Sequence, residues 1–374
     1  MLILLILLLA SFGYYLWFLL TVWRGLKRRE PPRAGSAGVF VSVVVAARNE
    51  EENIRRCLES LLDQDFPKDA YEVIVVDDHS TDRTPEIANE IAGSEPRGRL
   101  AVMSLGDGAG SSGKPSAIGL GVRQARGDLI LCTDADCIVP RGWMSSMARQ
   151  FAPGVAFVAG PVLEAPSRFF LSRLQSLEFM GLITTTAGLI GARRPIICNG
   201  ANIAYRKSAF QAVNGYGEGS GSCDDETLMQ RIATRAVGGI SFNKDSEAIV
   251  LTSTPRSIHE FWSQRTRWAA KRGRYENKAI LLRLILLYAF FPILLAAAIA
   301  SAFEPWLWVV VAASLVLKAC ADYITLREGA RMLHQAVPPW HFLIAELLHV
   351  PYIASAGLIG QLGSICWKDR NLNR

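Results

Sequence analysis

Pairs of aspartates stand where two short apolar runs of the sequence end. Asp77 and Asp78 follow one run, and Asp134 and Asp136 follow another. Hard divalent cations prefer oxygen ligands and often bind substrate phosphates as well. Asp134 and Asp136 could therefore share the binding of a metal ion and a nucleotide diphosphate, and the metal would neutralise a diphosphate leaving group. An Asp-x-Asp triplet alone is weak, because such triplets are also common in loops.

A second acidic segment, Ser222–Glu226, opens a predicted helix and contains Asp224 and Asp225. Acidic residues at a helix N-terminus are favoured by the helix dipole. A carboxylate there could also act as a general base toward an acceptor hydroxyl. The segment by itself supports both interpretations equally.

Gln264, Arg267 and Trp268 share one face of a helix that we expect to start at Ser257, with Glu260 completing a capping box. The planar guanidinium of an arginine suits a diphosphate, and a tryptophan offers a flat wall for a sugar ring. The alternative is a basic amphipathic helix against lipid headgroups. One helix face could serve both purposes.

The segment Gly108–Lys114 matches most of a phosphate-binding P-loop. The hydroxyl residue that should follow the lysine is replaced by Pro115, so a P-loop NTPase is disfavoured. We expect Lys114 to point toward a nucleotide or its phosphates instead.

The elements that must position these residues alternate between strand and helix over residues 39–275. The pattern predicts an α/β domain with a mostly parallel sheet and helices on both faces, which binds ligands at the carboxyl ends of its strands. The expected strands are Val41–Ala46, Val73–Val76, Leu100–Ser104 and Leu129–Thr133. Helices are expected from a capping box at Asn49 and Glu52 through Leu62, from Thr84 and Pro85, and from Ser116.

Apolar segments flank this domain on both sides. Residues 1–23 form an expected transmembrane anchor, and residues 284–367 contain further transmembrane or interfacial helices. The expected later spans are Leu284–Phe303, Trp306–Tyr323 and Val350–Trp367. Basic residues follow the first span, at Arg24, Lys27, Arg28, Arg29 and Arg33. They predict a multi-pass protein of the cell (inner) membrane with a cytoplasmic catalytic domain.

The last apolar segment conflicts with the tendency of basic residues to lie on the cytoplasmic side of a membrane. Four spans would place Lys368, Arg370 and Arg374 outside the cytoplasm. The segment is therefore either a span or a re-entrant or interfacial helix. Another segment, Ser167–Ala192, is apolar on most sides; it could be a core helix, but we expect it to lie at the membrane interface.

The composition also bears on nucleic-acid binding, disulfide bonds and zinc sites. The net charge is +6, but the basic residues cluster beside apolar spans, so we expect no nucleic-acid partner. The 7 cysteines are odd in number and form no Cys-x-x-Cys pair, which indicates neither a disulfide framework nor a zinc site.

Taken together and in order, the motifs over 41–271 resemble the inverting family 2 glycosyltransferases, which have a GT-A fold, and in particular the membrane-bound branch. The matching segments are Val43–Glu50, Val75–Asp82 (the Asp-Asp-x-Ser-Thr-Asp pattern), Gly113–Ala117, Asp134–Asp136 and Gln264–Trp268 (the QxxRW motif of cellulose- and hyaluronan-type synthases). The family's Thr-Glu-Asp is Cys223-Asp224-Asp225 here.

The resemblance implies a hexosyltransferase that inverts the anomeric carbon by direct displacement. It implies Asp225 as the base, with Asp224 as the second choice, and a divalent metal, Mg²⁺ or Mn²⁺, on Asp136 and Asp134. It also implies that the donor, a nucleotide-diphosphate sugar expected to be UDP-linked, contacts a further set of residues. These are Glu50, Asp77, Asp78, Lys114, Asp134, Gln264, Arg267 and Trp268.

The few apolar spans lead us to expect a membrane lipid or isoprenoid as the acceptor. A processive polysaccharide synthase is the alternative within the same class, although such synthases usually have more spans. A non-enzymatic transporter or scaffold with a nucleotide-binding domain is the alternative of another class. Transporters place their polar residues within broken membrane helices, whereas the charged motifs here lie in the α/β domain.

Overall fold

The computed structural model describes residues 1–28, 38–106, 113–166, 169–216, 224–255, 257–269, 275–362, 366–367 and 370–371. The chain forms two compact units. The helical unit comprises Met1–Arg28, Pro166–Arg194 and Thr254–Arg374, and the sheet unit comprises Arg29–Ala165 and Pro195–Ser253. Segments 166–194 and 254–275, which the sequence assigned to the α/β domain, thus group with the apolar helices.

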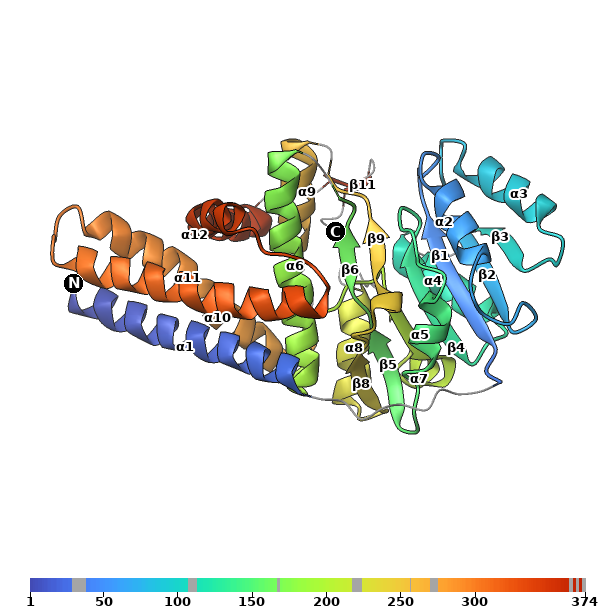
Figure 1. The fold of residues 1–374 in the computed structure, drawn as a ribbon, viewed down its shortest axis with the longest axis horizontal. Coiled ribbons are helices and arrows are strands. Elements are labelled where there is room, and N and C mark those ends of the chain that lie inside the picture. Colours follow the sequence, from blue (N-terminus) through green and yellow to red (C-terminus); the bar gives the residue numbers. More distant parts are fainter. Residues whose placement is uncertain are drawn as a thin grey trace. The chain divides into compact units, whose positions relative to one another are not determined.

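The sheet unit is built on a seven-stranded sheet in the order β3-β2-β1-β4-β7-β5-β8 (Figure 1). The strands are β1 (Val41–Ala47), β2 (Tyr71–Asp77), β3 (Leu100–Ser104), β4 (Leu129–Asp134), β5 (Val155–Ala159), β7 (Ile203–Arg206) and β8 (Gly239–Phe242). Only β7 runs antiparallel to its neighbours β4 and β5; the other pairs in this sheet are parallel. The predicted mostly parallel α/β fold is confirmed.

Central strands of this sheet are continuous apolar runs because helices cover both faces. All of β2 is buried, and α4 packs so closely on β1 that a Cβ on Gly121 would lie 2.4 Å from a Val44 methyl. The helices of this unit are α2 (Ile54–Leu62), α3 (Thr84–Ser94), α4 (Lys114–Gln124), α5 (Trp143–Ala148), α7 (Lys207–Ala212) and α8 (Asp224–Thr234). Shorter elements are β6 (Val162–Glu164), which pairs with β9 (Val250–Thr252), and the 3₁₀ turn η1 (Ser246–Ala248).

The predicted capping box at Asn49 is wrong. Helix α2 begins at Ile54, and Asn49 lies before it with a left-handed φ of 50°. Its side-chain oxygen accepts a hydrogen bond from the backbone N–H of Thr81 at 2.8 Å, so the asparagine ties two loops together instead of capping a helix. Asparagine tolerates this backbone region better than most residues.

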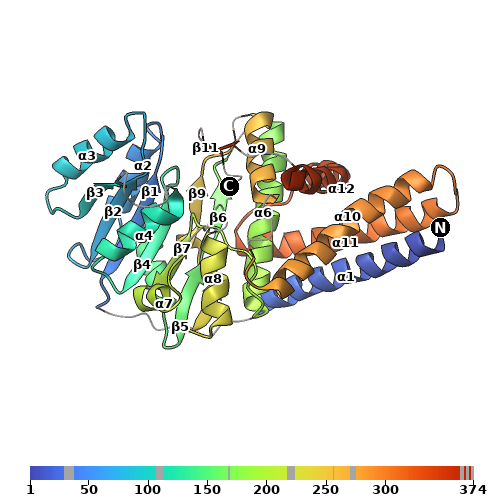
Figure 2. The ribbon, with the colours of Figure 1, turned by 180° about the vertical axis from the view of Figure 1, so that it is seen from behind.

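The helical unit contains four helices long and apolar enough to cross a membrane. They are α1 (Leu2–Lys27), α10 (Lys278–Ala300), α11 (Leu307–Met332) and α12 (Pro339–Leu362). Helices α1, α10 and α11 lie side by side (Figures 1 and 2). Lys27 pairs with Glu328 at 2.8 Å, which brings the C-terminal ends of α1 and α11 together. Helix α10 therefore runs in the opposite direction to both.

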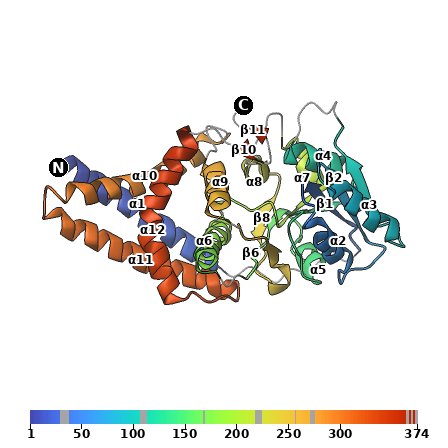
Figure 3. The same ribbon diagram turned by 90° about the horizontal axis from the view of Figure 1, so that it is seen from above.

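Helix α12 does not run alongside the other three. Figure 3 shows it crossing them at a steep angle, and Figure 1 views it nearly end-on. It also begins earlier than predicted, at Pro339 instead of Val350, and it continues through Pro351. The chain after it contains a short hairpin of β10 (Cys366–Trp367) and β11 (Arg370–Asn371).

Helices α6 (Phe170–Gly191) and α9 (Ile258–Ala269) run beside each other. They cross the end of the bundle that α1, α10 and α11 form. The crossing of α6 and α1 is a backbone contact, because a Cβ on Gly25 would lie 1.8 Å from the Gly188 carbonyl oxygen. Small residues permit such close helix approach. The helix predicted for Ser167–Ala192 is confirmed, and its location at a membrane surface stays a prediction.

Candidate active site

The carboxyl ends of β1, β2 and β4 form one edge of the sheet, and the predicted aspartates lie there. Asp77 lies opposite Ala47 in the pairing of β2 with β1, and Asp134 lies opposite Ala46 in the pairing of β4 with β1. The short apolar end of β1 thus separates two acidic strand ends. Parallel topology alone brings these residues together.

Two loops at this edge are joined to each other by hydrogen bonds. The backbone N–H groups of Asn49 and Glu50 donate to the Ser80 hydroxyl at 3.0 Å and the Thr84 hydroxyl at 2.7 Å. Asp77 is buried, and its Oδ1 has no hydrogen-bond partner among the described residues. A buried unpaired carboxylate oxygen is costly in an apo protein and is typical of a ligand site.

Lys114, at the start of α4, lies between two of the predicted acidic groups. Its Nζ is 2.6 Å from Asp134 Oδ1 and 3.3 Å from Asp225 Oδ2. Desolvation alone would lower the pKa of Lys114, but the carboxylates of Asp134 and Asp225 raise it well above its ordinary value. The lysine therefore remains a cation at this edge of the sheet.

Asp225 lies in the first turn of α8, and both of its carboxylate oxygens are fixed. Tyr216 donates its hydroxyl to Oδ1 at 3.2 Å, and Lys114 contacts Oδ2. The backbone of Gly200 lies against the same carboxylate, since a Cβ there would be 1.7 Å from Oδ2. Neither Tyr216 nor Gly200 belongs to a sequence motif, so neither could be singled out without the structure. The side chain of Asp224, the second candidate base, lies outside the described residues.

Asp136 lies two residues beyond Asp134, and its Oδ2 accepts a hydrogen bond from Thr252 at 3.1 Å. Desolvation raises the pKa of Asp136 to about 6, and the negative charges of Asp134 and Glu50 add to this effect. Carboxylates that raise one another's pKa mark an excess of negative charge that a cation would relieve. The oxygen donors present here fit a hard divalent ion.

Helix α9 carries Gln264, Arg267 and Trp268, and the structure places all three in the helical unit. The expected start is confirmed, because the Glu260 N–H donates to the Ser257 hydroxyl at 3.1 Å. The roles of the three residues toward a donor stay predictions.

The buried residue of the motif is Arg265, which the sequence analysis passed over. Its guanidinium lies 4.3 Å from the Trp268 ring centroid and 4.7 Å from that of Phe261. It donates to Gln264 Oε1 at 2.6 Å and forms an ion pair with Glu178 of α6. Arg265 therefore contacts two of the three predicted motif residues while holding α9 against α6.

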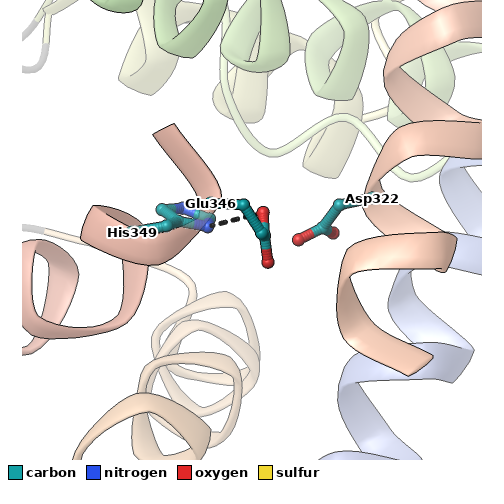
Figure 4. A group of neighbouring side chains, drawn as sticks. All are labelled: Asp322, Glu346 and His349. Carbon is teal, nitrogen blue, oxygen red and sulfur yellow. Dashed lines mark ion pairs between the residues drawn. The ribbon is translucent and has the colours of Figure 1, made fainter. Parts of the chain in front are cut away.

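Three side chains able to bind a metal ion lie close together in the helical unit. Figure 4 shows Asp322 of α11 with its carboxylate turned toward Glu346, and His349 one turn further along α12. Lys318 has no exposed surface, and its Nζ lies 2.7 Å from Asp322, 3.0 Å from His349 and within an ion pair with Glu346. The lysine ammonium already supplies the cation, so this cluster is an ionic contact between α11 and α12 and does not fit a metal site.

The sequence of this chain matches two known protein families. The family described as "Glycosyl transferase family 2" matches residues 42–213, and "Glycosyl transferase family group 2" matches residues 129–320, which is more than half of the chain. The chain belongs to the family 2 glycosyltransferases. The resemblance drawn from the motifs is thereby confirmed, and so is the expectation of a transferase at the level of the family.

Among curated family members, the chain is 32% identical over 246 residues to the beta-monoglucosyldiacylglycerol synthase of Synechocystis sp., covering 63% of this chain and 48% of that protein. It is 26% identical over 237 residues to the poly-beta-1,6-N-acetyl-D-glucosamine synthase of Staphylococcus epidermidis, covering 61% and 53%. The chain thus spans about half the length of the curated relatives it matches.

Among solved structures, the mannosyltransferase PcManGT from Pyrobaculum calidifontis, in complex with GDP-Man and Mn²⁺, shares the fold with a TM-score of 0.61. The match has 23% identity and covers 95% of this chain and 98% of that chain. This family 2 chain therefore shares its architecture with a protein that has nearly the same extent.

Proposed function

We propose that this chain is a membrane glycosyltransferase that transfers a hexosyl group from a nucleotide-diphosphate sugar to a hydroxyl or phosphate oxygen of a membrane lipid. The observation that carries the proposal is the grouping of Asp225, Lys114 and Asp134 at the carboxyl edge of the sheet. A fixed carboxylate beside a cation and an Asp-x-Asp pair supplies both a base and a diphosphate site.

In the proposed reaction, Asp225 accepts the proton of the acceptor while the acceptor oxygen attacks the anomeric carbon. The bond to the diphosphate breaks in the same displacement, so the configuration inverts and no covalent enzyme intermediate forms. Tyr216 and Lys114 hold the two carboxylate oxygens of Asp225 in place for this step. Asp77 and Asp78 bind the nucleotide, and Glu50 lies in the adjoining loop.

A divalent metal ion is proposed as cofactor, held by Asp134 and Asp136. It would neutralise charge on the departing diphosphate. The oxygen donors at this edge and the raised pKa of Asp136 support this assignment. PcManGT, which shares the fold, was solved with Mn²⁺.

For the membrane part, we propose that α1, α10 and α11 span the bilayer and that α12 lies across them. Arg24 and Lys27 are exposed at one end of α1, and the pair of Lys27 with Glu328 places the end of α11 at the same level. Three spans would return the C-terminal basic residues to the side of Lys27. This arrangement agrees with the charge rule and supports a cytoplasmic catalytic unit.

A lipid acceptor is supported by the glucosyldiacylglycerol synthase among the relatives and by the many large apolar side chains exposed on the helical unit. The poly-N-acetylglucosamine synthase relatives favour the second candidate, a processive polymer synthase. The nucleotide is proposed to be UDP, as the resemblance implies.

Two substitutions separate the proposed roles of the aspartates. Asp225→Asn should bind donor nearly as well as the wild type but transfer no sugar, because only the base is lost. Asp136→Ala should lose metal-dependent donor binding as well as transfer. Titration of donor with and without Mn²⁺, followed by single-turnover transfer, measures both steps. Near wild-type turnover by Asp225→Asn would show that another residue is the base.

A further inference from the structure

A patch on the helical unit combines two arginines with two aromatic rings. It consists of Tyr14 and Trp17 on α1, Arg194 just after α6, and Arg283 in the second turn of α10. The Arg194 guanidinium lies 5.1 Å from the Trp17 ring centroid, and the rings of Tyr14 and Trp17 lie 5.4 Å apart. The Tyr14 hydroxyl donates to the Arg283 carbonyl oxygen at 3.4 Å. Three separate chain segments thus converge on this basic–aromatic patch.

Neither arginine of the patch has its charge compensated. Both side chains are exposed, and neither forms an ion pair with a carboxylate in the described part of the chain. Trp17 is itself 44% exposed. An exposed guanidinium over an aromatic ring keeps its hydrogen-bond donors available to a second partner.

The patch combines the start of the uncharged run of α10 with the middle of α1. Arg283 directly precedes the uncharged run of α10, and Tyr14 meets it from α1. Lys27 and Glu328 lie further toward the same end of the bundle. Aromatic residues concentrate at the headgroup level of a bilayer, and basic pockets between spans bind anionic headgroups.

Arg194 distinguishes this patch from the ordinary basic flank of a membrane span. It follows α6, which is not among the helices able to cross a membrane, and the chain carries it onto α1. The preceding Arg193 has a left-handed φ of 59°. The backbone thus turns sharply where it brings Arg194 to Trp17.

We infer that the basic–aromatic patch binds the phosphate of an anionic glycerophospholipid in the leaflet next to Lys27 and Glu328. The planar guanidinium groups of Arg194 and Arg283 donate to the phosphate oxygens in a fork geometry that an ammonium cannot reproduce. Trp17 and Tyr14 contact the glycerol region of the same lipid. The inference rests on the proposed spans, but it does not depend on sugar transfer.

The test uses the full-length protein in nanodiscs of phosphatidylcholine with a minor fraction of phosphatidylglycerol. Native mass spectrometry then counts phosphatidylglycerol retained as the protein is released from the discs. We expect the double variant Arg194→Gln/Arg283→Gln to retain phosphatidylglycerol about thirtyfold less well, from the contribution of two charges near an anionic surface. Conversion of both residues to lysine should restore only part of the retention.

The matched control is Arg97→Gln/Arg235→Gln, which removes two exposed arginines of the sheet unit and changes the net charge equally. It should retain lipid as the wild type does. Equal retention by wild type and Arg194→Gln/Arg283→Gln would overturn the inference, as would an equal loss in the control. Displacement of the lipid by millimolar inorganic phosphate would overturn it too, because the site would then take free phosphate. Failure to enter nanodiscs would refute the spans themselves, and sugar transfer, measured separately in detergent, would be unaffected.

Discussion

Replacement of Gly200 by alanine is expected to stop the chemical step while leaving donor binding largely intact. The added Cβ would lie 1.7 Å from Asp225 Oδ2 and 2.7 Å from Lys114 Nζ, whereas ordinary van der Waals contact begins at 3.4 Å. The Asp225 carboxylate must therefore move away from the added Cβ by roughly another 1.7 Å. Such a movement also disturbs its contacts with Lys114 and Tyr216.

The size of the effect follows from the geometry. A misplacement of about 1 Å in an active site can cost about a hundredfold in rate. We expect the turnover of Gly200→Ala to fall by at least about a hundredfold, or roughly 3 kcal/mol in activation free energy. The KM for the donor should change less than the turnover, because the added Cβ is much closer to Asp225 Oδ2 than to Lys114 Nζ.

The assay is steady-state sugar transfer by purified protein, with thermal unfolding measured in parallel. Gly160→Ala is the matched control: its Cβ would lie 2.3 Å from the Asn202 side chain, so it crowds the same unit without contacting Asp225. Gly93→Ala, where nothing lies within 4 Å, controls for the substitution itself. A folded Gly200→Ala protein with turnover within about threefold of the wild type would refute the assignment of Asp225. An equal loss in Gly160→Ala would attribute the effect to packing.

Three further predictions concern charge. In metal-free protein near neutral pH, Asp136→Asn should raise the free energy of unfolding by about 1–3 kcal/mol, because folding raises the pKa of Asp136 to about 6 and so penalises its ionised form. The gain should vanish below about pH 4, and equal stability near neutral pH in a denaturant titration would contradict this. Arg265→Met should destabilise by about 3 kcal/mol, because it leaves the partly buried Glu178 without its cationic partner, and the double variant Arg265→Met/Glu178→Met should recover most of that. A double variant no more stable than Arg265→Met in detergent unfolding would show that packing, not charge, dominates. Lys318→Met should lower the unfolding midpoint strongly, because it removes the cation between two carboxylates. The control Lys278→Met, at an exposed position, should change the midpoint little. Equal midpoints for both variants would contradict the ionic contact.

Local patterns in the sequence were enough to predict the parallel strands β1 to β4, but not β5, β7 and β8 of the same sheet. The strand Leu100–Ser104 is found with the predicted bounds, and the helix start at Thr84 is confirmed. Both depend on neighbouring residues alone: an apolar run in one case, and a proline at the first turn in the other. The carboxylates Asp77 and Asp134 could be placed at one edge because parallel strands end together.

Contacts between distant residues could not be predicted in the same way. Asn49 has the composition of a helix cap, but its side chain binds Thr81 across the sheet edge, and the helix begins later. Gly200 is required only because Asp225 packs on its backbone, and no local pattern records that. Arg265 occupies a variable position of its motif, and its burial depends on Glu178 of another helix.

The last apolar helix shows a different limit. Hydropathy and length alone make α12 a candidate span, and it remains one by those criteria. Glu346 and His349 of this helix contact the buried Lys318 of α11. The basic residues after this segment signalled an exception in the sequence, but only the structure identifies Lys318 as the partner of Glu346 and His349.

The central proposal is sugar transfer to a membrane lipid, and the fate of a labelled sugar tests it most directly. Purified full-length protein in lipid vesicles would be incubated with Mn²⁺ and a panel of radiolabelled UDP- and GDP-sugars, and the products partitioned between chloroform–methanol and water. We predict label in the organic phase with the wild-type protein and none with Asp225→Asn. Label confined to water-soluble or high-molecular-weight product, or no consumption of any donor, would contradict the proposal.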